Sequence, residues 1–204
     1  MLIKKLRQTS PGRVTVCFED GTEIKSSLNV VTDLRLCSGK DLDETEMSTL
    51  RSASGRSAAR DRALEMVSRR MMSGKELRDK LIQKGESEEN ADYCVSWLSE
   101  NGFLNDETYA AAVARHYAAK GYGAGRVRSE LSRRGISREL WEDALDAMPE
   151  PDSKLDRLIA SKLKDPNDRD AVRKLSGALY RRGYSWDEIR SALARYNAET
   201  DEEY

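Results

Sequence analysis

The chain has 204 residues and a formal net charge of −1, because 35 Lys and Arg residues are balanced by 36 Asp and Glu residues. Charged residues make up 35% of the sequence and aromatic residues only 6%, a composition that favours several small hydrophobic cores over one deep core. The balanced total predicts no general attraction to polyanions, and no apolar run approaches the ~20 residues that a membrane helix needs.

The three cysteines are Cys17, Cys37 and Cys94. They are few, odd in number and widely spaced, which predicts neither a disulfide framework nor a zinc site and is typical of a reducing compartment. The first five residues lack the apolar core of a signal peptide. We therefore expect a cytoplasmic protein that does not associate with a membrane.

Residues 1–52 are predicted to form a β-rich extension that includes a short helix. Within it, Val14, Val16 and Phe18 alternate with polar residues, which is the period-2 pattern of a half-buried strand. The dipeptide Asp20-Gly21 follows and predicts a two-residue hairpin turn, since both central positions of such a turn favour positive φ.

The rest of the extension is predicted from shorter signals. Residues 22–28 are expected to be the return strand of the hairpin. Because a two-stranded ribbon alone is marginal, we expect it to gain a third strand from residues 2–7 or to pack on the segment that follows. Residues 30–36 are expected to be a short strand or a turn. A short helix is predicted over 41–50, and the small polar residues of 51–57 predict a flexible joint.

From residue 58 onward, one helical phrase occurs three times. Each copy has Leu or Val at its first position, Leu four residues later, Gly four residues after that, and Ser two further on. The matched positions are Leu77, Val127 and Leu175; Leu81, Leu131 and Leu179; Gly85, Gly135 and Gly183; and Ser87, Ser137 and Ser185. The glycines are 50 and then 48 residues apart, and repetition at that period is typical of a tandem array.

Start and stop signals place three helices in each copy. Serines such as Ser137 and the pair Ser185 and Glu188 predict helix starts, and the shared glycines predict helix ends. The predicted domains are the extension at 1–52, repeats at 58–104, 105–149 and 152–197, and an acidic tail at 198–204. The expected fold class is mainly α: an elongated tandem array of three-helix units with a small N-terminal extension containing a β-hairpin.

Basic residues recur just before the shared glycines, and residues 152–196 hold 11 Lys and Arg against 7 Asp and Glu. One cation in the last turn of a helix complements the helix dipole by roughly 0.3–1 kcal/mol, but the doubled arginines of the second and third copies exceed that need. Repeated in each unit, they would form a stripe suited to a phosphate backbone or an acidic protein groove. The predicted contact residues are Arg126, Arg128, Arg133, Arg134, Arg173, Lys174, Arg181 and Arg182, with Tyr122 as a secondary contact.

Other conspicuous residues predict structure rather than chemistry. The run Gly121–Gly125 lacks the Lys-Ser/Thr pair and the preceding strand of a phosphate loop, so it is predicted to be a tight turn between helices. The single histidine, His116, has no Ser or Cys partner at a spacing that suggests a catalytic triad. Trp97, Trp141 and Trp186 are expected to anchor the cores. The sequence predicts no metal site, no cofactor and no enzymatic activity.

These motifs resemble the RecX family, bacterial regulators of the RecA recombinase, over roughly residues 58–196. The resemblance rests on Ser73-x-x-Glu76-Leu77-x-x-Lys80-Leu81-x-x-Lys84-Gly85, on Gly102-Phe103-Leu104-Asn105-Asp106 with Tyr109-Ala110, and on Gly123-x-x-Arg126-Val127-x-x-Glu130-Leu131-x-x-Arg134-Gly135-Ile136. One departure is Asn105, where the family usually has Asp, and Asn remains a competent helix cap.

Membership of that family would imply a non-enzymatic protein that lies in the helical groove of a RecA–DNA filament. It would limit ATP hydrolysis and strand exchange, with a place in DNA repair, recombination and the SOS response. The alternative is a direct DNA-binding module, because small three-helix units with basic helices resemble helix-turn-helix proteins. The expected partners are therefore the RecA filament and, more weakly, single- or double-stranded DNA, and the expected state is a monomer.

Overall fold

A computed structural model describes residues 1–149 and 152–202 of the protein, and for residues 152–153 and 198–202 it describes the backbone alone. The predicted acidic tail at 198–204 therefore lies outside the described side chains. The chain divides into two compact units: Met1–Met72 with Glu76–Leu104, and Ser73–Lys75 with Asn105–Tyr204. Among the described residues, none of the helices combines the length and the apolar composition of a membrane span.

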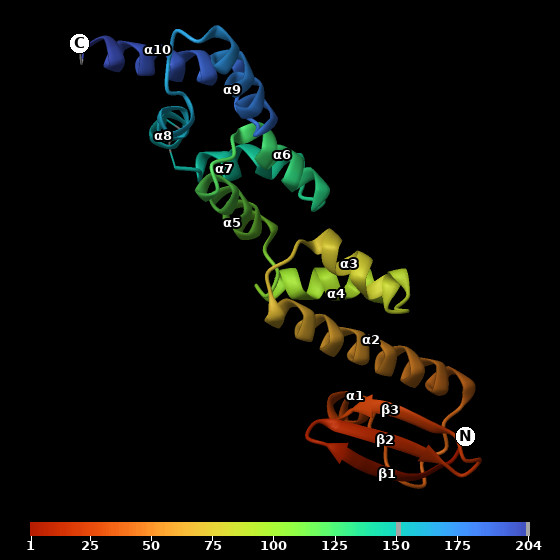
Figure 1. The fold of residues 1–204 in the computed structure, drawn as a ribbon. Helices are drawn as coiled ribbons and strands as arrows, with labels where there is room; N and C mark the ends of the chain where they lie inside the picture. The colour runs from red at the N-terminus through yellow and green to blue at the C-terminus, as the bar shows by residue number, and fades with distance from the viewer. Residues whose placement is uncertain (150–151, 203–204) are drawn as a thin grey trace. The chain divides into compact units, whose positions relative to one another are not determined.

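The N-terminal extension folds around a three-stranded antiparallel sheet in the order β1-β2-β3 (Figure 1). The strands are β1 (Ile3–Ser10), β2 (Arg13–Phe18) and β3 (Glu23–Ser27). They confirm the predicted strands, including the third one at the N-terminus. Val14, Val16 and Phe18 enter the hydrophobic core of the extension as their alternation predicted.

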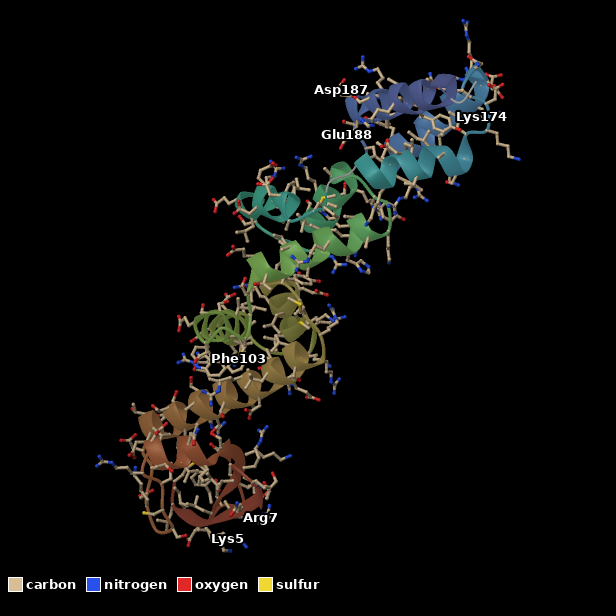
Figure 2. The ribbon with its side chains drawn as sticks, turned by 90° about the vertical axis from the view of Figure 1, so that its left-hand side faces the viewer. Lys5, Arg7, Phe103, Lys174, Asp187 and Glu188 are labelled. Atoms are coloured by element: carbon tan, nitrogen blue, oxygen red, sulfur yellow. The ribbon has the colours of Figure 1, made fainter. Side chains whose placement is uncertain are left out.

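The prediction that β2 is half-buried is wrong, because Thr15 and Cys17 on its other face are also buried. β2 is the central strand, and long polar side chains from both neighbours cover that face. Arg7 on β1 and Glu23 on β3 form an ion pair at 3.1 Å across it. Figure 2 shows Arg7 with Lys5 on β1.

The hairpin turn is also built differently from the prediction. Gly21 has a φ of +88°, whereas Asp20 is outside the positive-φ region. Asp20 instead acts as a side-chain acceptor, since its carboxylate receives hydrogen bonds at 3.0 Å from both the backbone N–H and the hydroxyl of Thr22. These bonds lower the pKa of Asp20. One glycine and one local side-chain cap therefore suffice to reverse the chain.

Residues 30–36, predicted to be a strand or a turn, contain most of a helix, α1 (Leu28–Asp33). The β-branched residues Val30 and Val31 suggested a strand, but their burial in the extension core is achieved on one face of a helix. Ser27 fixes the start of this helix, because its hydroxyl accepts a hydrogen bond from the Val30 N–H.

The predicted flexible joint at 51–57 is wrong, because these residues lie inside one 26-residue helix, α2 (Glu44–Arg69). The predicted short helix over 41–50 is its first part. α2 passes between the sheet and α4 (Figure 1). The small residues serve close packing rather than flexibility: the buried hydroxyls of Ser54 and Ser26 lie 2.8 Å apart between α2 and β3.

The C-terminal half of α2 forms the first repeat with α3 (Gly74–Gln83) and α4 (Glu88–Glu100). The second repeat contains α5 (Asp106–Ala119), α6 (Ala124–Arg133), the short 3₁₀ turn η1 (Arg138–Leu140) and α7 (Trp141–Asp146). The third contains α8 (Asp152–Lys162), α9 (Arg169–Arg181) and α10 (Trp186–Glu202). Each repeat encloses its own hydrophobic cluster.

The repeated Leu, Val and Gly positions behave alike in all three copies. The matched Leu and Val side chains are buried, and the matched glycines have φ values of +90°, +70° and +95°, as expected for left-handed helix ends. Ser185 and Glu188 form the predicted capping box at 2.6 and 3.2 Å. Ser137 makes no capping hydrogen bond, because η1 starts there. The mainly α fold, with tandem three-helix units after a small N-terminal sheet, is confirmed.

Candidate partner-binding surface of the second and third repeats

The second and third repeats meet at two glycine segments, Gly121–Arg126 and Arg182–Tyr184, which we name the glycine joint. The N–H of Gly123 donates to the Arg182 carbonyl at 3.0 Å, and the N–H of Gly125 donates to the Gly183 carbonyl at 2.9 Å. The two backbones are so close that a Cβ on Gly123 would lie 2.5 Å from the Gly183 oxygen. The predicted tight turn is therefore also a contact surface between repeats.

Arg182 and Tyr122 belong to this joint. A guanidinium nitrogen of Arg182 donates to the Gly121 carbonyl at 3.5 Å, and its guanidinium carbon lies 5.6 Å from the centre of the Tyr122 ring. The guanidinium carbon of Arg126 lies 5.8 Å from the same centre. These distances suit cation–π attraction, so the structure gives both Arg182 and Tyr122 roles within the fold.

Three of the predicted contact arginines surround one carboxylate, Glu130, whose residue is only 4% exposed. Its oxygens lie 3.0 Å from Arg126, 2.7 Å from Arg133 and 3.9 Å from Arg134. Arg134 also donates to the Tyr109 hydroxyl. These arginines therefore compensate a buried negative charge. The stripe predicted from the sequence did not include this structural role.

The protonation of Glu130 reflects this cluster. Burial alone would raise the pKa of Glu130, but hydrogen bonds from Arg133 and Tyr117 and the charges of Arg133 and Arg126 outweigh it and lower the pKa. In return, the hydrogen bond and charge of Glu130 raise the pKa of Arg133. Glu130 is thus ionised at neutral pH and fixes one face of α6.

Two further contact residues are paired with exposed carboxylates. Arg128 lies 3.3 Å from Glu142, and Arg173 lies 3.2 Å from Asp170. Exposed pairs of this kind contribute only about 0–1 kcal/mol. Because each pair is exposed, a partner with its own negative charges could take over either arginine at little cost.

Lys174 and Arg181 differ from the other predicted residues. Both are exposed on α9, and in the described part of the chain neither has an ion pair or a hydrogen bond to a side chain. Figure 2 shows Lys174 on the third repeat, with Asp187 and Glu188 at the start of α10. Lys174 and Arg181 are therefore the two contact candidates with no competing role in the fold.

An exposed aromatic pair lies beside Arg181, and the sequence alone did not predict it. Tyr180 and Trp186 are 53% and 51% exposed, and their rings stack with centres 5.0 Å apart and planes 16° apart. The prediction that Trp186 anchors the core is wrong. Tyr184 and Ile189 fill the core at that point, so the first residue of α10 is left outside.

Tyr180 of this pair lines a pocket of about 600 Å³ at the glycine joint. Its lining includes Arg126, Arg128, Ser129, Tyr180, Arg181 and Glu188. The structure thus brings together three of the predicted cations, while Arg133 and Arg134 end α6 and Arg173 and Lys174 lie in the N-terminal half of α9. The exposure of Tyr180 could have been predicted from the sequence, because Tyr180 directly follows the buried Leu179 and adjacent residues do not share a helix face.

Among the described residues, no group of three or more His, Cys, Asp or Glu residues could hold a metal ion. His116 is exposed and contacts Tyr117 edge-on at 5.6 Å. The arrangement of cations, hydroxyls and exposed aromatic rings is suited to recognising an acidic or anionic partner.

Comparison with known proteins gives matches in all three repeats. Family models described as the first, second and third three-helix domains of RecX match residues 59–98, 105–145 and 154–193. The curated "Regulatory protein RecX" of Vibrio vulnificus is 30% identical over 141 residues, covering 67% of this chain and 92% of that protein. The Bacillus licheniformis protein of the same name is 28% identical over 196 residues, covering 93% and 74%.

Two solved structures share the fold. A crystal structure described as regulatory protein RecX has a TM-score of 0.77 at 22% identity and covers 93% of this chain and 97% of its own. The crystal structure of RecX from Lactobacillus salivarius has a TM-score of 0.63 at 23% identity, with coverages of 72% and 99%. The longer match spans the N-terminal extension as well as most of the repeats.

Proposed function

The chain belongs to the RecX family of regulatory proteins, and we propose that it regulates a RecA recombinase by binding the RecA–DNA filament. The observation that carries the proposal is the succession of three RecX three-helix domains, each with its own core. The protein acts in the cytoplasm, by binding rather than by catalysis. It lowers the ATPase and strand-exchange activities of the filament.

We place the filament contact on the second and third repeats, in the groove of the filament. Lys174 and Arg181 are the leading contacts, because they are exposed and unpaired among the described residues. Arg128 and Arg173 follow, since their exposed ion pairs are easily exchanged. Tyr180 and Trp186 add apolar area beside Arg181.

The proposed mechanism of inhibition depends on the tandem arrangement of the three-helix repeats. Several weak contacts on linked repeats raise the effective concentration of each next contact, so the array can bind tightly without any single strong site. Binding one state of the filament better than another shifts the filament toward that state by the difference in affinity. Inhibition of ATP hydrolysis therefore requires contacts that differ between filament states.

The test is the ATPase activity of RecA on single-stranded DNA, with and without this protein. We expect the wild-type chain to lower the rate, and the double variant Lys174→Glu with Arg181→Glu to lose most of that inhibition. A matched control is Lys162→Glu with Arg157→Glu, which makes the same charge change on exposed residues of α8 in the same repeat.

Each outcome of this test is informative. Loss of inhibition in the α9 variant alone supports the contact surface. Equal losses in both double variants would mean that only the total charge of the repeat matters. Full inhibition by the α9 variant would remove Lys174 and Arg181 from the site, and no effect of the wild-type chain on RecA would contradict the proposed function itself.

The second candidate is a direct DNA-binding module, favoured by the exposed Tyr180–Trp186 pair beside Arg181, which has no ion pair among the described residues. Proteins that bind single-stranded DNA combine aromatic rings for base stacking with a positive groove for the backbone. A DNA binder retains naked DNA with an affinity that falls steeply as salt rises. A filament regulator lowers the RecA ATPase at concentrations far below those that saturate the DNA.

A further inference from the structure

A second pocket lies within the N-terminal unit, away from the predicted contact residues. Its volume is about 540 Å³, and α1, α2 and α4 line it. One face of α2 supplies hydroxyl groups from Ser48, Thr49, Ser52 and Ser57 and guanidinium groups from Arg56 and Arg60. Side chains three or four residues apart share a helix face, so these donors form one row.

The polar groups of this row are not all satisfied within the fold. Ser57 is only 7% exposed, and its hydroxyl is buried with no hydrogen-bond partner. The Nε atom of Arg56 is likewise buried without a partner, although the end of its guanidinium pairs with Glu89 at 2.6 Å. A buried polar group without a partner costs free energy, so this pocket lacks an acceptor that something outside the chain can supply.

Arg60 adds a cation with no carboxylate partner among the described residues. Its guanidinium carbon lies 4.9 Å from the centre of the Trp97 ring, and this stacking leaves its N–H donors unused. Arg56 is already paired with Glu89, and the acidic residue in the pocket lining, Asp33 on α1, forms no ion pair with Arg60 among the described residues. Arg60 is therefore the cation that remains available to a ligand. The pocket therefore favours an anion with several acceptor oxygens, which is the chemistry of a phosphate group.

The pocket has room for a phosphate group that belongs to a larger molecule, because its volume far exceeds one such group and the exposed residues Ser48, Thr49 and Ser52 open it to solvent. Tyr93 on α4 also lines it and offers an aromatic ring beside the cations. Positive charge beside an aromatic ring is the combination with which proteins bind single-stranded nucleic acid.

We propose that the pocket between α1, α2 and α4 binds a backbone phosphate of single-stranded nucleic acid through Arg60, Arg56 and Ser57. This gives the N-terminal extension a function, because α1 closes one side of the site. The proposal is independent of RecA regulation: it concerns naked nucleic acid and residues outside the second and third repeats.

The experiment measures binding of the full chain to a fluorescein-labelled oligothymidylate by anisotropy, over a range of salt concentrations. For single strands, each neutralised phosphate contributes about 0.7 to the slope of log affinity against log salt. Arg60→Gln should therefore reduce the slope by about 0.7, which corresponds to roughly fivefold weaker binding at 0.1 M salt. Arg60→Lys should keep the slope, because the charge is retained.

The matched control is Arg51→Gln, which removes the same charge from an exposed residue of α2 outside the pocket lining. It should leave affinity and slope at their wild-type values. Ser57→Ala should weaken binding without changing the slope and without lowering the melting temperature, because it removes an unsatisfied hydroxyl. A purely structural role for Ser57 would instead lower the melting temperature and leave binding unchanged.

Two results would overturn the proposal. Equal losses for Arg51→Gln and Arg60→Gln would show that the pocket has no special part in binding. The second result concerns the source of the phosphate. If inorganic phosphate at constant ionic strength raises the melting temperature of the wild-type chain but not of Arg60→Gln, and oligonucleotide binding is the same in both proteins, the site is one for free phosphate. Neither result depends on RecA.

Discussion

The second and third repeats carry cations at matched positions but use them differently. With the shared glycines aligned, Arg126 corresponds to Lys174, and Arg133 to Arg181. In the second repeat the buried Glu130 pairs with both of its arginines, whereas the third repeat has Ala178 at the position of Glu130. A single carboxylate thus decides whether the same cations stabilise the fold or remain available to a partner.

The second and third repeats are held together at the glycine joint, and Gly183→Ala tests the importance of this contact. We expect this variant to lose more stability than any other considered below. Gly183 has a φ of +95°, and an added Cβ would lie 2.2 Å from the Arg126 nitrogen. Backbone strain and overpacking should together cost about 2–5 kcal/mol. Urea denaturation monitored by circular dichroism measures this loss.

Gly85→Ala is the matched control for that variant. Gly85 ends the corresponding helix of the first repeat with a φ of +90°, but an added Cβ there would meet nothing within 4 Å. Only the cost of the left-handed backbone applies, about 1–2 kcal/mol. If the two variants lose equal stability, the close contact between repeats adds nothing, and the joint is only a turn.

Glu130→Gln tests the structural use of arginines in the second repeat. The substitution keeps the volume of the side chain but removes the charge that compensates Arg126, Arg133 and Arg134. Hydrogen bonds to charged groups contribute about 1.5–3 kcal/mol, and the partly exposed guanidinium groups reduce the loss, so we expect about 1–2 kcal/mol in urea denaturation.

The neighbouring Glu142→Gln is the control for Glu130→Gln, since Glu142 is exposed and pairs with one arginine, Arg128. It should change stability by no more than about 0.5 kcal/mol. A Glu130→Gln variant as stable as the control would show that the arginines of α6 need no internal carboxylate.

Features of the fold that depend on residues close together in the chain could be predicted from the sequence, whereas features that depend on contacts between distant residues could not. The repeated core positions and helix ends were predicted, because Leu77, Leu131 and Gly183 act through their own helices. The continuity of α2 was not, since its small residues are also typical of a joint. Their role becomes clear only from the contact of Ser54 on α2 with Ser26 on β3.

The candidate site was predicted in part for the same reason. Its cations were identified, yet their separate uses depend on Glu130, and acidic residues are rarely fully buried. The contact of Gly123 with Gly183 depends on the angle between repeats, which no local pattern contains. Aligning the repeats does reveal the exchange of Glu130 for Ala178, and that signal was available in the sequence.

A carboxylate added to the third repeat tests directly whether Glu130 accounts for the difference between the two repeats. Ala178→Glu places an acidic side chain in the third repeat where Glu130 stands in the second. It should pair with Lys174 and Arg181 and so make them less available, reducing inhibition of the RecA ATPase by several-fold. Ala178→Gln is the uncharged control and should inhibit like the wild-type chain. Unchanged inhibition by Ala178→Glu would contradict the view that unpaired cations carry the contact.

The smallest expected effect is a pH dependence of stability that belongs to Glu130. Its pKa is lowered in the folded chain from an ordinary value of 4.5, so the ionised form is favoured by folding. The stability it contributes is complete above that ordinary value and is lost as the pH falls below it toward the folded-state pKa. The difference in denaturation midpoint between the wild-type chain and Glu130→Gln should therefore be constant from pH 8 to about pH 5.5 and shrink toward pH 3. A difference that persists at pH 3 would mean that Glu130 stabilises the second repeat through packing and neutral hydrogen bonds, so that charge is not what distinguishes it from Ala178.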